Sequence, residues 1–269
     1  MNFTQGKTKN EIIAQNENHE ILGYGYIYES MASKILKADR VNYFIEMAVD
    51  HNDEEVKRDI AHHLIDVAKM WKSKNYPSVE GRVYHCCFAH DEAGIDFYSA
   101  VAGFVHDEGM LILERSLDSV MDVQVINEYQ LIEDNLSSTE STEVFIKEHS
   151  HIFSSAYTYE KLNAMKRGNQ LKSFGLYDGD DIIANILIVN EAYEGKDQWW
   201  IEDLYVHSDY RKKGLASYLL SVSHDYLKKL NAENVKLEVW SANNKATALY
   251  YKMGYKIYLE SQVSIGMSI

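Results

Sequence analysis

The chain has 269 residues, of which 46% are hydrophobic, and this is enough for two domains of ordinary size with packed cores. It carries 41 acidic and 27 basic residues, and the formal net charge of −14 disfavours nucleic acid or an anionic membrane as a partner. The acidic balance favours a cationic small substrate, or it serves only solubility.

Targeting and covalent features are few. No apolar run reaches the ~18 residues that a membrane helix needs, and the N-terminus MNFTQGKTKN has no apolar signal core, which together predict a soluble cytoplasmic protein. The neighbouring Cys86 and Cys87 lie in an alternating segment and are expected to be buried free thiols. The 11 histidines show no zinc-type spacing with Cys or Glu, so no metal is assigned.

The first half of the chain predicts strands and helices in alternation. Residues 11 to 29 suggest two strands, and FIEMAV from Phe44 to Val49 suggests a further strand. A helix is expected from Ile60 to Trp71, then a strand from Val83 to Ala89 and a helix within Ala89 to Phe104.

The loop before the first helix is acidic. Residues 50 to 59 contain no glycine and have five carboxylates against Lys57 and Arg58. Asn52 and Glu55 stand at capping-box spacing, so this helix is expected to satisfy its first N–H groups with side chains.

A boundary between two domains is expected between Ser116 and Thr142, in a stretch with the turn-favouring Asp118, Asn135, Ser137 and Ser138. The following stretch, from Ser138 to Gly168, is rich in aromatic residues. These belong to a hydrophobic core or line a substrate pocket, and they are Phe145, His149, Phe153, Tyr157 and Tyr159.

The most informative segment joins a strand to a helix through a glycine loop. Trp200 to Val206 favours a strand, and Leu215, Leu219, Val222, Tyr226 and Leu230 recur at helical spacing. Between them lies RKKGLA, from Arg211 to Ala216. The first turn of a helix leaves N–H groups without partners and carries partial positive charge, so Gly214 and Ala216 would let an anion approach these donors.

This loop predicts a phosphate-binding site, with Arg211, Lys212 and Lys213 adding positive charge at its rim. The alternative is a solvated turn with a basic edge. The next segments decide in favour of the phosphate site, because Val235 to Trp240 predicts another strand and the helix after it starts at an asparagine and stops at Gly254.

These segments resemble the GNAT superfamily of acetyl-CoA-dependent N-acetyltransferases, over about residues 120 to 269. Arg211, Gly214 and Ala216 stand in the pyrophosphate-loop positions of that family. The second helix matches the pattern N-x-x-A-x-x-L-Y-x-K-x-G-aromatic through Asn243, Ala246, Leu249, Tyr250, Lys252, Gly254 and Tyr255.

The first half repeats the second in weakened form, which predicts two tandem GNAT-like domains. The expected fold class is α/β (α+β), with a mixed, mostly antiparallel sheet flanked by helices in each domain. We expect residues 1–118 to form a degenerate domain without cofactor, lacking the opening strand and two helices of the family, and 119–269 to form the acetyl-CoA-binding domain.

The resemblance implies where the coenzyme binds. Leu204, Tyr205 and Val206 would form the strand edge that pairs with the pantetheine arm. The diphosphate would lie over the amides of Lys212, Lys213, Gly214, Leu215, Ala216 and Ser217, with Arg211 alongside. Asn243 would contact the coenzyme arm, or it is a plain helix N-cap.

Two side chains are candidates for the chemistry. Glu202 would accept the proton of the amine, because on a strand it shares a face with Leu204 and Val206, while Asp203 would point to the opposite face. The sequence around it is also similar to that of diamine acetyltransferases, in which the corresponding glutamate is the proposed base. Tyr250 would stabilise the leaving sulfur. The alternatives are a rim carboxylate for Glu202 and a core aromatic for Tyr250.

The expected function is therefore transfer of acetyl from acetyl-CoA to a primary amine of a small cationic or amino-acid-like acceptor by direct attack. A protein or peptide N-acetyltransferase and a non-catalytic CoA-binding module are the alternatives. No nucleic acid or membrane partner is expected, and a monomer and a homodimer stay equally open.

Overall fold

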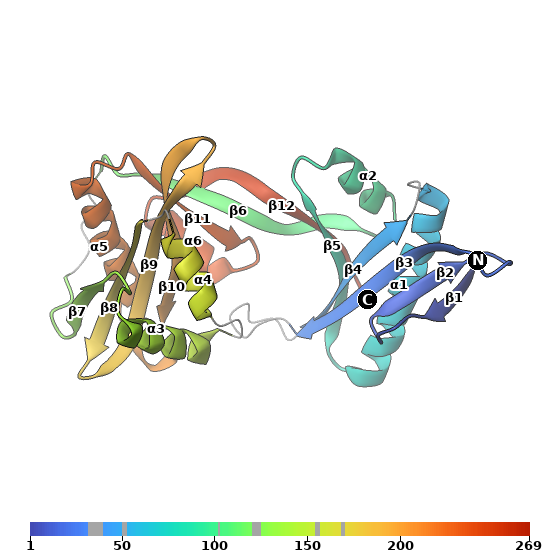
Figure 1. Ribbon diagram of the computed structural model, residues 1–269, viewed down its shortest axis with the longest axis horizontal. Coiled ribbons are helices and arrows are strands. Elements are labelled where there is room, and N and C mark those ends of the chain that lie inside the picture. Colours follow the sequence, from blue (N-terminus) through green and yellow to red (C-terminus); the bar gives the residue numbers. More distant parts are fainter. Residues whose placement is uncertain (32–39, 50–52, 102, 120–124, 154–156, 168–169) are drawn as a thin grey trace. The chain divides into compact units, whose positions relative to one another are not determined.

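The computed structural model describes residues 1–31, 40–49, 53–101, 103–119, 125–153, 157–167 and 170–269. These residues form two compact units (Figure 1). The first comprises Met1–Leu111, Trp240–Asn244 and Glu260–Ile269, and the second comprises Ile112–Val239 and Lys245–Leu259. The boundary near residue 118 stays a prediction, and the C-terminal ten residues, expected in the second domain, belong to the first unit.

The first unit is a sheet with helices. Its elements are β1 (Asn2–Gln5), β2 (Glu11–Gln15), β3 (Ile21–Met31), β4 (Arg40–Val49), α1 (Glu54–Asn75), β5 (Glu80–Phe88), α2 (Glu92–Ala100) and the first part of β6 (Val105–Ser116). Strands β1 to β4 pair antiparallel in order, β4 pairs parallel with β5, and the C-terminal part of β12 pairs antiparallel with β5.

The second unit has the same order of elements with two more helices. It contains β7 (Gln130–Asp134), α3 (Thr139–Ile152), α4 (Tyr159–Lys166), β8 (Gln170–Asp178), β9 (Asp181–Tyr193), β10 (Lys196–Val206), α5 (Leu215–Lys229), β11 (Asn234–Trp240), α6 (Asn244–Lys252) and the start of β12 (Lys256–Ser268). Strands β7 to β10 pair antiparallel, and β10 pairs parallel with β11.

The burial pattern of each central strand reflects how many helices cover the sheet. In β3 buried positions alternate, because α1 packs on one face, where Gly25 faces Ile60 and Leu64. In β9 eight consecutive residues from Ile182 are buried. Here α5 packs on β8, β9 and β10, and the core under α3 and α4 includes Leu187 of β9.

The mixed, mostly antiparallel fold class is confirmed, and one expectation about the first unit is wrong. An opening strand is present, since β1 pairs with β2 as β7 pairs with β8. Residues 6–10 join β1 to β2 without a helix, whereas α3 and α4 stand between β7 and β8. The short polar strand NFTQ gives little periodic signal, which explains why the sequence pattern missed it.

Helix α1 is capped by a different residue from the one expected. Asp53 is its N-cap, and its carboxylate accepts from the amides of Glu55 (3.0 Å) and Val56 (3.2 Å). Asn52, the predicted cap, lies outside the described residues. The helix start is therefore satisfied by a carboxylate and followed by Glu54 and Glu55, an arrangement that disfavours an anion.

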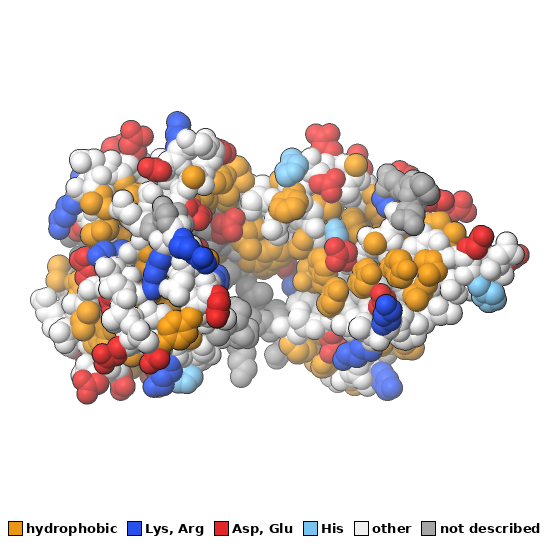
Figure 2. Space-filling model, viewed as in Figure 1, with side chains coloured by type: hydrophobic (Ala, Val, Ile, Leu, Met, Phe, Trp, Pro, Cys, Tyr) orange, Lys and Arg blue, Asp and Glu red, His pale blue; other side chains and the backbone are white. Residues whose placement is uncertain are grey.

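Surface charges are mixed. Figure 2 shows acidic and basic side chains interspersed on the viewed face, and hydrophobic side chains gather over the sheet of the first unit, where β3 exposes Ile21, Tyr28 and Met31. Among the described residues, no helix is long and apolar enough to cross a membrane. Both cysteines are free, with Cys87 buried and Cys86 half-buried.

Candidate active site

A β-bulge interrupts β10 at Glu202. Ile201 pairs with Ile188 of β9 and Asp203 pairs with Leu187, so Glu202 is the extra residue. A bulge re-aims the side chains around it. Glu202 and Asp203 therefore both lie on the face of the sheet that carries α3 and α4. Glu202 contacts Tyr157 there, and Asp203 contacts His149 of α3.

Strands β10 and β11 separate at this bulge, directly after Ile201. Their parallel pairing consists of Trp200 with Lys236 and Ile201 with Leu237. Among the described residues, no register pair joins β11 to Leu204, Tyr205 or Val206. The predicted coenzyme edge is thus a strand segment whose β11 side is open for backbone pairing.

The loop before α5 has the backbone shape that an anion site needs. Gly214 is the N-cap of α5 with a φ of 83°, and Lys212 also has a positive φ of 64°. No side chain caps the helix, its first turn holds no acidic residue, and a Cβ added at Gly214 would meet nothing within 4 Å. The first amides of α5 are therefore approachable, in contrast to those of α1.

The three basic residues of this loop differ in their contacts. Arg211 Nε donates to the carbonyl of Val206 at 3.0 Å, which ties the loop to the end of β10. Lys213 Nζ donates to the Tyr129 hydroxyl at 3.0 Å and lies 4.9 Å from the centre of the Tyr210 ring. Lys212 is exposed. All three leave positive charge near the start of α5.

Glu202 has a defined environment. The Tyr157 hydroxyl donates to its Oε1 at 3.2 Å, and Lys161 Nζ lies 4.0 Å from the same oxygen. Burial raises the pKa of the Glu202 carboxyl above its ordinary value, although Lys161 and the Tyr157 hydrogen bond act in the opposite direction. Its side chain is 31% exposed, so the carboxylate can be reached. A reachable carboxylate with a raised pKa is suited to accept a proton.

Asp203 was expected on the opposite face from Glu202, and this is wrong. Its Oδ2 lies 2.6 Å from His149 Nε2 of α3, and the His149 ring stands 4.6 Å from that of Tyr157, the partner of Glu202. The bulge places both carboxylates on the helical side, and strict alternation along the sequence could not reveal this.

Tyr250 lies on α6 and is 9% exposed. Burial raises the pKa of its phenol, and the charge of Asp203 raises it further, so the group stays protonated at neutral pH. Its neighbour Tyr251 is 46% exposed and points elsewhere, as expected. Asn243 directly precedes α6, and Gly254 ends the helix with a φ of 82°.

A buried polar chain lies behind Tyr250, and no sequence signal pointed to it. Arg115 of β6 donates to His224 Nδ1, and since Arg115 can only donate, Nε2 carries the proton that His224 donates to the Tyr255 hydroxyl at 2.8 Å. The Tyr255 ring is 5.7 Å from that of Tyr250. Burial, followed by the Arg115 charge, lowers the pKa of His224 to about 3.

In the first unit, a side chain fills the position where β4 and β5 separate. Their pairing ends at Phe44 with Tyr84, and the next residue, His85, donates from Nδ1 to the carbonyl of Ile45 at 2.7 Å. The His85 ring stacks at 4.1 Å on Tyr98 of α2. The backbone edge that is open in β10 is therefore engaged by an imidazole in β4.

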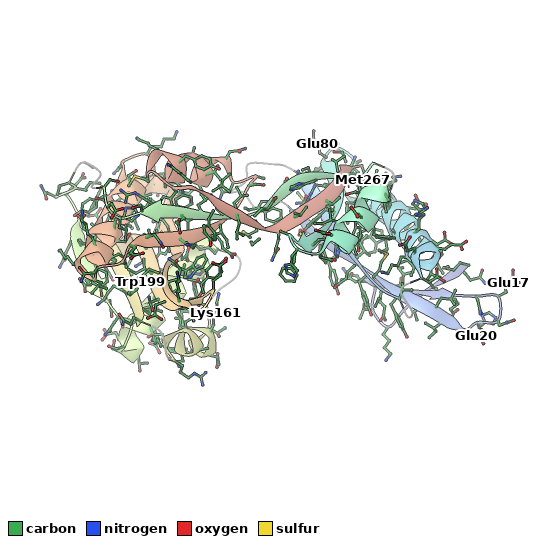
Figure 3. The ribbon with its side chains drawn as sticks, turned by 90° about the horizontal axis from the view of Figure 1, so that it is seen from above. Glu17, Glu20, Glu80, Lys161, Trp199 and Met267 are labelled. Atoms are coloured by element: carbon green, nitrogen blue, oxygen red, sulfur yellow. The ribbon has the colours of Figure 1, made fainter. Side chains whose placement is uncertain are left out.

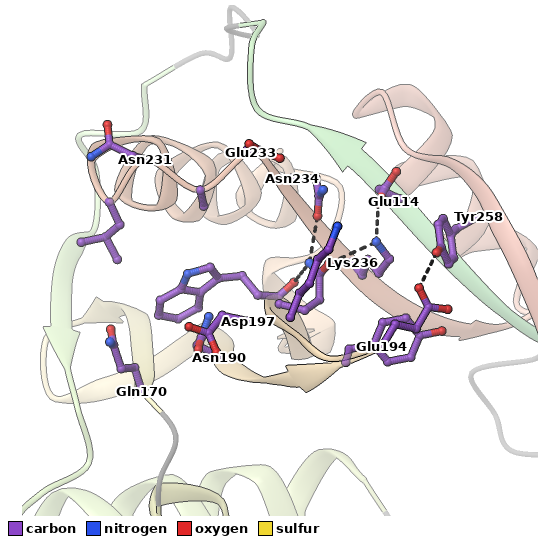
Figure 4. A pocket seen from close by; sticks show the side chains of 16 residues that line it. Glu114, Gln170, Asn190, Glu194, Asp197, Asn231, Glu233, Asn234, Lys236 and Tyr258 are labelled. Carbon is purple, nitrogen blue, oxygen red and sulfur yellow. Dashed lines mark hydrogen bonds and ion pairs between the residues drawn. The ribbon is translucent and has the colours of Figure 1, made fainter.

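A pocket of about 800 Å³ lies at the other end of β10 from Glu202 (Figure 4). Its polar groups bind one another: Lys236 donates to Gln198 at 3.1 Å, Gln198 to Asn234 at 2.9 Å, and Tyr258 to Glu194 at 2.8 Å. None of the site residues predicted from the sequence lines it.

A bulged strand, two separating parallel strands and an uncapped glycine-led helix are thus brought together in the second unit. Residues 138–255 match the model of the Acetyltransferase (GNAT) family. They therefore form a GNAT acetyltransferase domain.

Solved structures share the fold over most of the chain. A GCN5-related N-acetyltransferase from Sphaerobacter thermophilus is 12% identical with a TM-score of 0.52, and the match covers 96% of this chain and 80% of that one. A tandem GNAT protein from the clavulanic acid biosynthesis pathway is 12% identical, with a TM-score of 0.50 and coverage of 96% and 82%. A relative from Anabaena variabilis is 11% identical, with a TM-score of 0.54 and coverage of 96% and 62%. At these identities the likeness concerns the fold alone, and it supports the tandem GNAT architecture.

Proposed function

We propose that this protein is an acetyl-CoA-dependent N-acetyltransferase that acts on the primary amine of a small molecule. The observation that carries the proposal is the start of α5. Its amides are uncapped, Gly214 holds the left-handed conformation with open space above it, and the open edge of β10 ends beside it. This geometry fits a diphosphate followed by an extended arm.

Acetyl-CoA would supply the acetyl thioester. Residues 212 to 217 would hold its diphosphate with Arg211 nearby, and Leu204 to Val206 would pair with its arm, with Asn243 as a further contact. The first unit is proposed to bind no coenzyme, because Asp53 caps α1 and His85 occupies the place where β4 leaves β5.

Glu202 and Tyr250 would perform the proton chemistry. An aliphatic amine has a pKa near ~10 and arrives protonated at neutral pH, so the site must take up a proton before or during attack. Glu202 would accept it, and its hydrogen bond from Tyr157 would stabilise the ionised carboxylate beforehand. As the C–N bond forms and the C–S bond breaks, the protonated Tyr250 would donate a hydrogen bond to the sulfur.

Calorimetric titration with acetyl-CoA tests this proposal. We expect one site per chain, lost in Gly214→Glu, because the new side chain strains the backbone and brings a negative charge to the diphosphate position. Gly195→Glu is the matched control, since Gly195 also has a positive φ of 77° with nothing within 4 Å and lies in the β9–β10 turn.

Each result has a distinct meaning. Binding that survives Gly214→Glu would contradict the assignment of the loop. Binding to wild type without thiol release for any amine would favour the CoA-binding module over the enzyme. Acetylation of peptide N-termini in preference to free small amines would favour the peptide acetyltransferase.

A further inference from the structure

Two opposite charges flank the hydroxyl and ring of Tyr157. Glu202 Oε1 accepts from the Tyr157 hydroxyl, and Lys161 Nζ lies 4.0 Å from the same oxygen. Figure 3 labels Lys161, whose side chain is 57% exposed, while that of Glu202 is 31% exposed. The proposed base therefore has a reachable ammonium group as its neighbour.

The position of Lys161 is fixed by the local structure. Thr158 caps α4 by accepting from the amide of Lys161 at 3.1 Å, which sets the first turn of the helix. The ammonium group lies 4.3 Å above the ring of Tyr157. Tyr157 is 5% exposed and belongs to the core that holds Phe145 and Leu162. An anchored aromatic ring thus orients an otherwise mobile side chain.

The ion pair itself contributes little to stability. Pairs between exposed side chains gain little free energy because water screens them and side-chain entropy opposes them. A ligand that offers Glu202 a new cation and Lys161 a new anion can therefore separate the pair at low cost. The pair is better explained as recognition of a ligand than as a structural bond.

We propose that the acceptor is a zwitterion of the α-amino acid type, whose carboxylate binds Lys161 while its amine faces Glu202. This inference rests on the proposed function. An α-amino acid carries its ammonium and carboxylate groups on one carbon, so the two groups can reach Glu202 and Lys161, whose charged atoms are 4.0 Å apart, at the same time. A diamine would instead bring its second cation toward Lys161, and a simple amine would leave Lys161 without a partner.

For the choice of acceptor, the charges next to Glu202 matter more than the net charge of −14. Charges farther away than a Debye length of ~8 Å are screened at physiological salt, whereas Lys161 is 4.0 Å from the base. The negative charges of Glu191 and Asp203 also raise the pKa of Glu202, but Asp203 Oδ2 lies 2.6 Å from His149 Nε2. The acidic surface alone suggested a cationic acceptor, and the site favours a zwitterion.

The reaction balances with this acceptor. The ammonium nitrogen loses one proton to Glu202, and the resulting amine forms a bond to the acetyl carbon. The C–S bond breaks, its electron pair leaves on sulfur, and the second proton that the nitrogen loses as it becomes an amide converts the thiolate to the free thiol. The carboxylate of the acceptor is unchanged and serves only to position the amine beside Glu202.

Matched substrate pairs test the inference. Each pair is an amino acid and the amine that lacks its carboxylate, such as phenylalanine with phenethylamine, leucine with isopentylamine, and lysine with cadaverine. We expect kcat/KM of wild type to favour the amino acid of at least one pair by about tenfold. Lys161→Met is expected to lower kcat/KM for that amino acid about tenfold while changing its amine less than about threefold.

The control and the charge-reversed variant sharpen the test. Lys69→Met removes an exposed lysine that also lies 4.0 Å from a carboxylate, that of Asp66 on α1, and it should change neither substrate. Lys161→Glu should shift the preference from lysine toward cadaverine. An amine preference in wild type, or equal losses for both members of each pair in Lys161→Met, would overturn the inference.

Failure of the proposed function would look different. If acetyl-CoA produces no heat or no thiol is released with any amine, the enzyme proposal fails. Titration of the protein with the amino acids themselves then decides the inference. Binding that weakens in Lys161→Met supports the zwitterion site, and no binding of any amino acid contradicts it.

Discussion

Tyr250 combines nearly complete burial with a position on α6, the helix that follows β11. Burial and the charge of Asp203 keep its phenol protonated, so the group can donate a hydrogen bond throughout the neutral range. We expect Tyr250→Phe to lower kcat about 100-fold, as for loss of one preorganised donor, with acetyl-CoA affinity within about twofold. Thiol release measures kcat, and calorimetry measures the affinity for acetyl-CoA. Tyr251→Phe, at the exposed neighbouring position, should be neutral, and unchanged turnover in Tyr250→Phe would remove this residue from the mechanism.

Glu202 should determine the acidic limb of the pH profile. Its raised pKa means that the carboxyl is protonated, and inactive as a base, over a wider acidic range than an ordinary glutamate. The value of kcat/KM, which reports the ionisation of the free enzyme, is expected to rise with pH through a pKa above the ordinary Glu value. Glu202→Gln should lower kcat at least tenfold and abolish that limb. A limb that persists in Glu202→Gln would assign it to another group.

His224 should make the stability of the second unit depend on pH. Its pKa is lowered to about 3, so between the ordinary His value and that value the unfolded chain binds more protons than the folded one. The free energy of unfolding should therefore fall as pH falls below about 6.5, by up to ~1.4 kcal/mol per unit. His224→Gln keeps an acceptor for Arg115 and a donor for Tyr255. Denaturant titrations should show this slope reduced in His224→Gln and unchanged in His151→Gln, an exposed histidine.

At the scale of elements, equivalent helices of the two units start in opposite ways. The first amides of α1 are bound by Asp53, while α5 begins at Gly214 with no side-chain cap. A cap stabilises the helix that it closes, and an uncapped start leaves its donors for a ligand. The stability of α1 and the anion binding proposed for α5 therefore depend on the same unpaired amides at a helix start.

Asp53→Ala tests the structural half of this contrast. Loss of two hydrogen bonds at the helix start should cost about 1 kcal/mol of unfolding free energy in the first unit. Hydrogen exchange of α1 amides should speed up accordingly. Asp59→Ala, an exposed position within the same helix, is the control and should have a smaller effect. Equal effects of both substitutions would mean that charge, rather than the cap, matters.

At the scale of the whole molecule, the last strand completes the sheet of the first unit. Gln262 to Ser268 of β12 pair with Phe88 to Arg82 of β5, and Val263 and Ile265 enter the core of that unit. The beginning of β12, by contrast, belongs to the second unit. The C-terminal strand is thus needed to complete the sheet and the core that the N-terminal half of the chain forms.

Substitutions in β12 should consequently act on one unit at a time. Ile265→Ala, at a fully buried position, should cost about 3 kcal/mol and speed up hydrogen exchange in β5, with acetyl-CoA affinity within about twofold. Ile257→Ala changes a residue of the same strand that is 56% exposed and should be near neutral. Loss of coenzyme binding in Ile265→Ala would show that the two units do not tolerate separate perturbation.

The sequence by itself determined the features that depend on local pattern. Alternation and helical spacing predicted β10, α5, β11 and α6, because side chains repeat every two residues in strands and about every 3.6 in helices. Gly214 and Gly254 marked a helix start and a helix end, since both need a left-handed backbone that other residues adopt at a cost. The tandem GNAT fold followed from these motifs and their repetition.

Tertiary structure alone decided the features that depend on distant partners. The bulge at Glu202 turns Asp203 toward His149, and it is defined only by the register with β9. Lys161 joins Glu202 from a helix about forty residues earlier, and Arg115 reaches His224 across more than a hundred residues. Likewise β12 pairs with β5 because buried backbone N–H and C=O groups need hydrogen-bond partners, whichever part of the chain supplies them. Such contacts leave no periodic trace in the sequence, since their free energy arises only when the packed sheets and helices bring the groups together.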